Sequence, residues 1–266
     1  MKINSSFVDI HCHLLPGLEE GPASWHESLD MARIACGDGI GAVIATTHQL
    51  SSFSDISPGR IRELVRKLRQ KLTAERIPLA IAPGAVMTIQ PDLLARLDQD
   101  KLITLADQRR HLLIEFPRDG MEPLEPLIQQ LIERKIQPIF SHPERNRRVV
   151  RHWAVVEELV EMGALFQITA SALTGAFGVS IRSLTEWLVQ ERLTHFIASD
   201  ANGTESRMPV MSRAFHRVTH LTDVHYAQEV CTENPRRILA GEAIPVIERR
   251  NRRYGFSHWF KWRKAG

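Results

Sequence analysis

Seven short apolar runs, separated by stretches with helical patterning, constrain the fold of this chain more than any other feature. They lie at residues 7–11, 41–45, 79–81, 112–114, 138–140, 165–168 and 195–198. Runs of this length are typical of buried strands, and their alternation with helices predicts parallel strands joined by crossover connections. A chain of 266 residues with 43% hydrophobic content can bury one sizeable core. We therefore expect a single α/β barrel domain over residues 1–245, followed by an extension over residues 246–266.

Two helix starts are visible in the sequence. Ser24 is followed three residues later by Glu27, which is the spacing of a capping box. Pro58 favours the start of a long charged helix that extends to about Arg76. Residues 61–72 place arginines and lysines between leucines, which is typical of an amphipathic helix on the outside of a barrel.

The ends of the apolar runs carry the residues that indicate chemistry. Six polar residues stand at or just past the carboxyl end of a predicted strand: His11, His13, His48, Glu115, His142 and Asp200. All such ends open on one face of an α/β barrel. One polar residue there could simply end a strand, but six on five strands predict a site for divalent cations. Mixed imidazole and carboxylate ligands suit Mn, Fe or Zn better than Mg or Ca.

The pair His11 and His13 is the most informative part of this pattern. Side chains alternate between the two faces of a strand, so both imidazoles point the same way and the thiol of Cys12 points oppositely. Two imidazoles on one rigid strand can bind a single cation.

Composition argues against several other classes of protein. A formal net charge of +3 is too small to imply a nucleic-acid partner. The three cysteines, Cys12, Cys36 and Cys231, are an odd number, which argues against a disulfide framework and favours a reducing compartment. The N-terminus lacks the apolar core of a signal peptide, and no apolar run approaches the ~20 residues of a membrane span. We expect a cytoplasmic protein.

Five motifs that carry these residues resemble a known family. They are DIHCHLLPGLEEGP at 9–22, ATTH at 45–48, IEFP at 114–117, SHPERN at 141–146 and ASDAN at 198–202. In order and spacing they resemble the polymerase-and-histidinol-phosphatase (PHP) domain, specifically the bacterial tyrosine phosphatases of capsular and exopolysaccharide biosynthesis. The resemblance extends from about residue 7 to about residue 240. It implies a distorted, TIM-like barrel of about seven parallel strands.

The resemblance also implies a cofactor and roles for named residues. It implies up to three divalent metal ions, manganese first, with zinc or iron as alternatives. The implied ligand groups are His11, His13 and Asp200 for the first ion, Glu115 and His142 for the second, and Glu20 and His48 for the third. Arg145 and Arg207 match family arginines that contact phosphate, and guanidinium groups suit the oxygens of a transferring phosphoryl group.

The implied reaction is hydrolysis of phosphotyrosine on the tail of a partner bacterial tyrosine kinase. Metal cations would polarise the phosphoryl oxygens and generate hydroxide near neutral pH. The extension at 249–264 interleaves aromatic and basic residues, so it could lie on an anionic membrane surface or bind an acidic kinase tail. We favour the alternative that its aromatic residues pack on the barrel.

Two metal-ligand positions depart from the family pattern. Val86 stands where the family has a glutamate that bridges the first and second ions, and valine cannot bind a metal. Asn202 stands where the family has a histidine, and its amide oxygen is a weaker ligand. Glu20 replaces an aspartate, which is a milder change. These departures keep open a catalytically silent relative that binds a phosphorylated or acidic partner, and a phosphatase of another phosphate ester.

A second phosphatase chemistry also has a match in the sequence. Cys231 and Arg237 have the C-x5-R spacing of cysteine-dependent phosphatases. The intervening loop lacks glycine, contains an acidic side chain and loses a backbone donor at Pro235. We expect Pro235 to begin the last short helix instead.

Overall fold

The computed structural model describes residues 6–51, 56–116, 123–147 and 149–245. Within these residues the strands form two parallel sheets. The first sheet has the order β1 (Phe7–Cys12), β2 (Ile40–Ala45) and β4 (Ala80–Pro83). The second has the order β3 (His48–Gln49), β5 (Val86–Met87), β6 (His111–Glu115), β7 (Gln137–Ser141), β8 (Leu165–Thr169) and β9 (Phe196–Ala198).

Backbone hydrogen bonds connect the two sheets. After β9, the amide of Asp200 donates to the carbonyl of His11 at 2.8 Å, and the amide of His13 donates to the carbonyl of Ala201 at 2.7 Å. Strands β1 and β9 therefore lie side by side.

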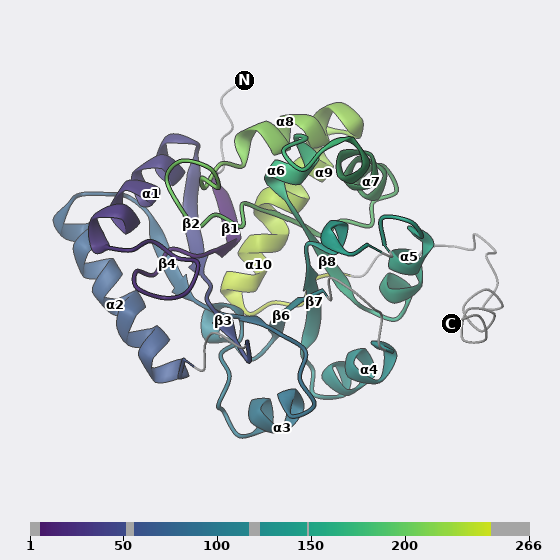
Figure 1. The fold of residues 1–266 in the computed structure, drawn as a ribbon, viewed down its shortest axis with the longest axis horizontal. Coiled ribbons are helices and arrows are strands. Elements are labelled where there is room, and N and C mark those ends of the chain that lie inside the picture. The colour runs from purple at the N-terminus through teal and green to yellow at the C-terminus, as the bar shows by residue number, and fades with distance from the viewer. Residues whose placement is uncertain (1–5, 52–55, 117–122, 148, 246–266) are drawn as a thin grey trace.

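The helices surround these strands, and α10 crosses the middle of the view (Figure 1). They are α1 (Trp25–Gly37), α2 (Pro58–Ala74), α3 (Leu93–Asp98), α4 (Glu125–Glu133), α5 (Ala154–Glu161), α6 (Ala170–Leu173), α7 (Val179–Gln190), α8 (Ser212–Leu221), α9 (Val224–Gln228) and α10 (Asn234–Ala240). Three short turns of other helix types are η1 (Leu105–Asp107), η2 (Pro143–Arg145) and η3 (Glu229–Glu233). Within the described residues, no helix has both the length and the apolar character that crossing a bilayer requires.

The predicted α/β architecture with parallel strands is confirmed. All seven apolar runs are strands, while the two-residue strands β3 and β5 were not predicted. Ser24 caps α1 by accepting a hydrogen bond from the amide of Glu27 at 3.2 Å, and the carboxylate of Glu27 accepts from Ala23 at 2.8 Å. Helix α2 ends at Ala74, slightly before the predicted Arg76. The predicted extension at 249–264 lies outside the described residues.

Two apolar clusters fill the molecule. The larger one packs one face of the strands against the helices. The smaller one, here called the inner cluster, lies on the other face and consists of Val8, Ile10, Ile44, Val86, Leu105, Leu113, Ile139, Leu165, Phe196, Ala198, Ile238 and Ile244. Because side chains alternate along a strand, Glu115 follows Leu113 on the same face of β6, and Gln167 follows Leu165 on β8. The strands thus place polar side chains next to the inner cluster, towards the carboxyl ends of the strands.

Candidate metal centre

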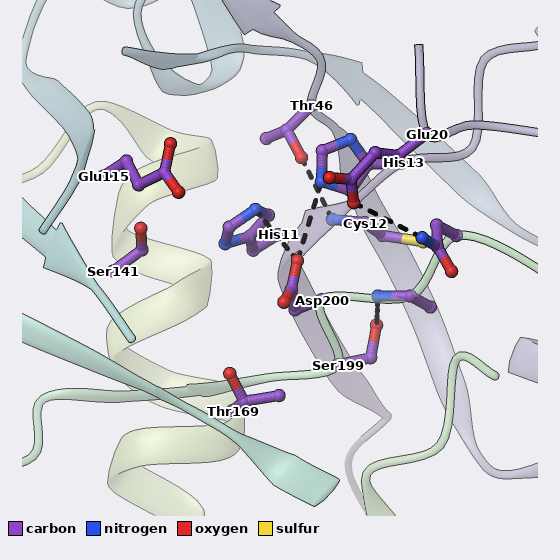
Figure 2. A network of polar contacts seen from close by, with 12 residues as sticks. His11, Cys12, His13, Glu20, Thr46, Glu115, Ser141, Thr169, Ser199 and Asp200 are labelled. Atoms are coloured by element: carbon purple, nitrogen blue, oxygen red, sulfur yellow. Dashed lines mark hydrogen bonds and ion pairs between the residues drawn. The ribbon is translucent and has the colours of Figure 1, made fainter. Parts of the chain in front are cut away.

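Two histidines from β1 meet an aspartate that follows β9. The Nε2 atoms of His11 and His13 lie 3.3 Å and 3.6 Å from Oδ1 of Asp200, and all three side chains are buried. Figure 2 shows both rings directed toward this carboxylate, while the sulfur of Cys12 points away. The opposite orientation of Cys12 was predicted, and Cys12 packs in the larger apolar cluster. This arrangement presents two imidazole nitrogens and one carboxylate oxygen to a common point.

A hydrogen bond to Gln167 fixes the orientation of the His11 ring. Its Nδ1 lies 2.9 Å from Oε1 of Gln167, and because that oxygen can only accept, Nδ1 carries the proton. The Nε2 lone pair therefore faces Asp200, and Nε2 is buried without a hydrogen-bond partner. Burial, followed by the neighbouring His13, lowers the pKa of His11 to about 4 despite the opposing effect of Asp200. His11 is thus neutral at pH 7, which is the form that binds metals.

A second group adjoins the first and shares His13 with it. One ligand atom each from His13, Glu20 and His48 lies within 4.8 Å of the others. The His13 and His48 rings stack with their centroids 5.1 Å apart. Nδ1 of His48 is also 3.8 Å from a carboxylate oxygen of Glu115. Burial lowers the pKa of His48 and so favours the neutral ring.

His142 lies beside His11. It follows β7 in a left-handed conformation with a φ of 40°, and its ring centroid is 5.8 Å from that of His11. Its Nδ1 is buried without a hydrogen-bond partner. Burial and the nearby Arg145 hold the pKa of His142 well below its ordinary value. The described residues contain no three-residue ligand group that includes His142 or Glu115.

Two arginines converge on the other oxygen of Asp200. The guanidinium of Arg145, in η2, pairs with Oδ2, and that of Arg207 approaches the same atom at 2.7 Å. Arg207 also pairs with Glu20 at 2.9 Å and donates to the Asp200 carbonyl at 2.8 Å. Although burial raises the pKa of Asp200, the charge of Arg145 is among the neighbouring effects that hold it well below its ordinary value. The carboxylate is therefore ionised.

The two departures from the family pattern occupy different surroundings. Val86 is fully buried in the inner cluster, beside His48 in the register of β3 and β5. It contributes no polar atom to the pocket. The amide nitrogen of Asn202 lies 3.4 Å from a carboxylate oxygen of Glu20, so Asn202 stands at the edge of the second ligand group.

The buried donor atoms fit a divalent cation. A buried polar atom without a partner loses its hydration and gains nothing in return, which costs free energy. His11 and His142 each carry such a ring nitrogen, and both rings are neutral and close to the ionised Asp200. Imidazole nitrogens and carboxylate oxygens together suit Mn, Fe or Zn.

Comparison with known proteins identifies the family. Residues 7–240 match the capsular polysaccharide synthesis family CpsB/CapC. The chain belongs to this family. It is 33% identical to the tyrosine-protein phosphatase YwqE of Bacillus subtilis over 94% of this chain and 99% of that protein. It is 26% identical to the tyrosine-protein phosphatase CpsB of Streptococcus pneumoniae over 89% of this chain and 100% of that protein.

Solved structures agree with this assignment. One structure, from work describing B. subtilis YwqE and S. pneumoniae CpsB as metal-dependent tyrosine phosphatases, superposes with a TM-score of 0.85 at 32% identity. The match covers 91% of this chain and 100% of the other. The dihydropyrimidinase of Brevibacillus agri has a TM-score of 0.53 at 9% identity, which shows a shared fold alone. The predicted family resemblance is confirmed.

Two positioning residues of this CpsB/CapC protein were missed in the sequence. Gln167 orients His11, and Asp9 joins β1 to β9 by accepting from the amides of His11 at 3.2 Å and Ser199 at 3.1 Å. Burial raises the pKa of Asp9 to about 6, against the opposing effect of its hydrogen bonds to Ser199. The sequence could have indicated both residues, because each is a polar residue inside an otherwise apolar run.

The cysteine alternative lacks a site in this family member. Cys231 is fully buried within η3, and burial raises the pKa of its thiol. A thiol in this environment is protonated and inaccessible, so it is a poor nucleophile. Arg237 lies on α10 and faces Glu242 at 4.0 Å. Helix α10 has its proline at the second position, as the sequence predicted for Pro235.

Proposed function

We propose that this protein is a metal-dependent phosphatase that hydrolyses phosphotyrosine. The observation that carries the proposal is the carboxylate of Asp200, which meets two histidines on one oxygen and two arginines on the other. Metal ligands and phosphate-binding groups then occupy one pocket. Membership of a family whose relatives are tyrosine-protein phosphatases supports the same reaction.

We assign the ligands as three groups, with manganese as the metal and zinc or iron as alternatives. The groups are His11, His13 and Asp200; Glu115 and His142; and Glu20 and His48 with the amide of Asn202. Cations held there would polarise phosphoryl oxygens and acidify water, which supplies a nucleophile near neutral pH.

The chain's own side chains provide binding and orientation. Arg145 and Arg207 place two guanidinium groups next to the ligands, where they would offset the charge of a phosphate dianion. Gln167 holds His11 in the tautomer that leaves Nε2 available. Asp9 fixes the distance between β1 and the segment that carries Asp200.

The substrate we propose is the phosphotyrosine-bearing tail of a bacterial tyrosine kinase that acts in capsular or exopolysaccharide synthesis. The family assignment supports this partner in general terms. We place the reaction in the cytoplasm, and the unpaired state of Cys12, Cys36 and Cys231 is consistent with a reducing compartment.

A silent relative is the second candidate, and Val86 favours it. A valine in the inner cluster provides no carboxylate between neighbouring cations, which repel each other strongly. Such a protein would bind a phosphorylated partner through Arg145 and Arg207 without hydrolysing the ester. Counting tightly held metal ions in the purified protein separates the candidates, since fewer than two per chain would favour the silent one.

The proposed function is tested by hydrolysis of a phosphotyrosine peptide with added Mn²⁺. We expect turnover in the wild type, a loss of at least about 100-fold in His142→Ala, and no change in Cys231→Ser. Activity that disappears in the cysteine variant but survives in the histidine variant would overturn the metal mechanism. A panel with phosphoserine, sugar phosphate and nucleotide substrates decides whether another ester is preferred.

A further inference from the structure

Large apolar side chains are exposed at a few places in the described part of the chain. They are Ile132, Met162, Phe177, Val179 and Met208. Ile132 and Met162 lie at the ends of α4 and α5 that lead into β7 and β8, so they are at the end of the strands away from the site. Phe177, Val179 and Met208 follow the carboxyl ends of β8 and β9, which is the end where the site lies.

Phe177 has a direct connection to the site. The guanidinium carbon of Arg145 lies 5.3 Å from the centre of the Phe177 ring, a cation–π contact. The same guanidinium pairs with Asp200. Arg145 therefore contacts the candidate metal centre on one side and an aromatic ring on the other, and 39% of Phe177 remains exposed to solvent.

The segment that carries Phe177 is held in a defined conformation. It joins α6 to α7 and has glycines on both sides, Gly175 with a φ of 96° and Gly178 with a φ of 90°. These are left-handed conformations that glycine adopts without steric cost. Helix α7 is fixed to the start of α5 by Trp187 and Trp153, whose ring centroids are 5.2 Å apart. The exposed ring thus lies next to Arg145 on a short connection whose following helix, α7, is anchored.

We infer that Phe177 is the specificity-determining residue that selects aryl over alkyl phosphate esters. The inference rests on the proposed function and extends it. Because the Phe177 ring lies 5.3 Å from the Arg145 guanidinium carbon, a phosphate bound by Arg145 would have its ester substituent within reach of that ring. A phenyl substituent gains from contact with an aromatic ring, whereas a small alkyl group presents little surface to it. Phe177 would therefore favour phosphotyrosine over phosphoserine or phosphothreonine.

Binding of two phosphonates, which are not hydrolysed, tests the inference. The Mn²⁺-loaded protein is titrated calorimetrically with phenylphosphonate and with methylphosphonate. We expect the wild type to bind the phenyl compound about tenfold more tightly, and Phe177→Ala to reduce this ratio to about twofold or less. Phe177→Tyr keeps the aromatic ring and should keep the ratio. Ile132→Ala removes an apolar side chain that is also exposed but lies at the far end, and should leave the ratio unchanged.

The outcomes separate this inference from the proposed function. Equal ratios in the wild type and Phe177→Ala would overturn the inference, even if the wild type hydrolyses a phosphotyrosine peptide. A wild type that binds both phosphonates equally, or neither, would also overturn it. A wild type without turnover that still shows a preference dependent on Phe177 would support the inference and count against hydrolysis.

Discussion

The carboxylate of Asp200 links the two kinds of chemistry in this pocket. One oxygen lies 3.3 Å from His11 and 3.6 Å from His13, and the other pairs with Arg145 and Arg207. The flanking groups keep Asp200 ionised in spite of its burial. Any change that moves this side chain affects the candidate metal ligands and the arginines together.

Gln167 should control metal affinity without touching a metal. Its oxygen holds the Nδ1 proton of His11, so Gln167→Leu removes the group that fixes the ring and its tautomer. We expect about 10- to 100-fold weaker Mn²⁺ binding, measured by competition with a fluorescent chelator. Gln129→Leu, an exposed position on α4, serves as the control. Equal affinities in the wild type and Gln167→Leu would show that the hydrogen bond does not support the ligand.

Val86→Glu should make the metal-free protein less stable and increase the rise in its Tm when Mn²⁺ is added. A carboxylate at this fully buried position lowers the free energy of unfolding in EDTA by roughly 2 kcal/mol, which is about 5 °C in Tm. Added Mn²⁺ should then raise the Tm of Val86→Glu more than that of the wild type, because the new carboxylate lies beside His48. Val8→Glu, elsewhere in the inner cluster, should be destabilised with no larger metal response. Equal Mn²⁺ responses in Val86→Glu and the wild type would contradict the prediction.

At the scale of elements, periodicity and length predicted what is regular. Each of the seven apolar runs became a strand because its residues pack on both faces, and Ser24 marked the start of α1. Strands β3 and β5 have two residues each, which is too short for an alternating pattern to show in the sequence. The left-handed conformation of His142 could not be predicted from the sequence either, because no local sequence pattern indicates it.

The same limits apply to the candidate site. Strand ends predicted which side chains share a face, and the structure brings His11, His13 and Asp200 together as one ligand group. The proximity of His48 to Glu115, and the sharing of His13 between two groups, depend on how β3 and β6 are placed across the sheet. Pairwise distances of this kind follow from tertiary packing and are not encoded in a local pattern.

At the scale of the whole molecule, residues 238–244, near the end of the described part of the chain, cover the end of the strands away from the site. Ile238 of α10 and Ile244 pack in the inner cluster. Gln137, at the start of β7, donates to the carbonyl of Ile244 at 2.9 Å and accepts from its amide at 2.7 Å. His111, at the start of β6, pairs with Gln137 in the strand register and is buried at this end.

His111 should make global stability fall in mild acid. Burial lowers its pKa from 6.5 to about 4, so between these values the unfolded chain binds the proton and the folded chain does not. The contribution of His111 is therefore complete above about pH 6.5, is lost as the pH falls toward 4, and declines no further below that. We expect the wild type to lose about 2 kcal/mol more than His111→Leu between pH 7 and pH 5, measured by urea unfolding in EDTA. His26→Gln, at an exposed position on α1, should behave like the wild type, and parallel losses in His111→Leu and the wild type would place the acid sensitivity elsewhere.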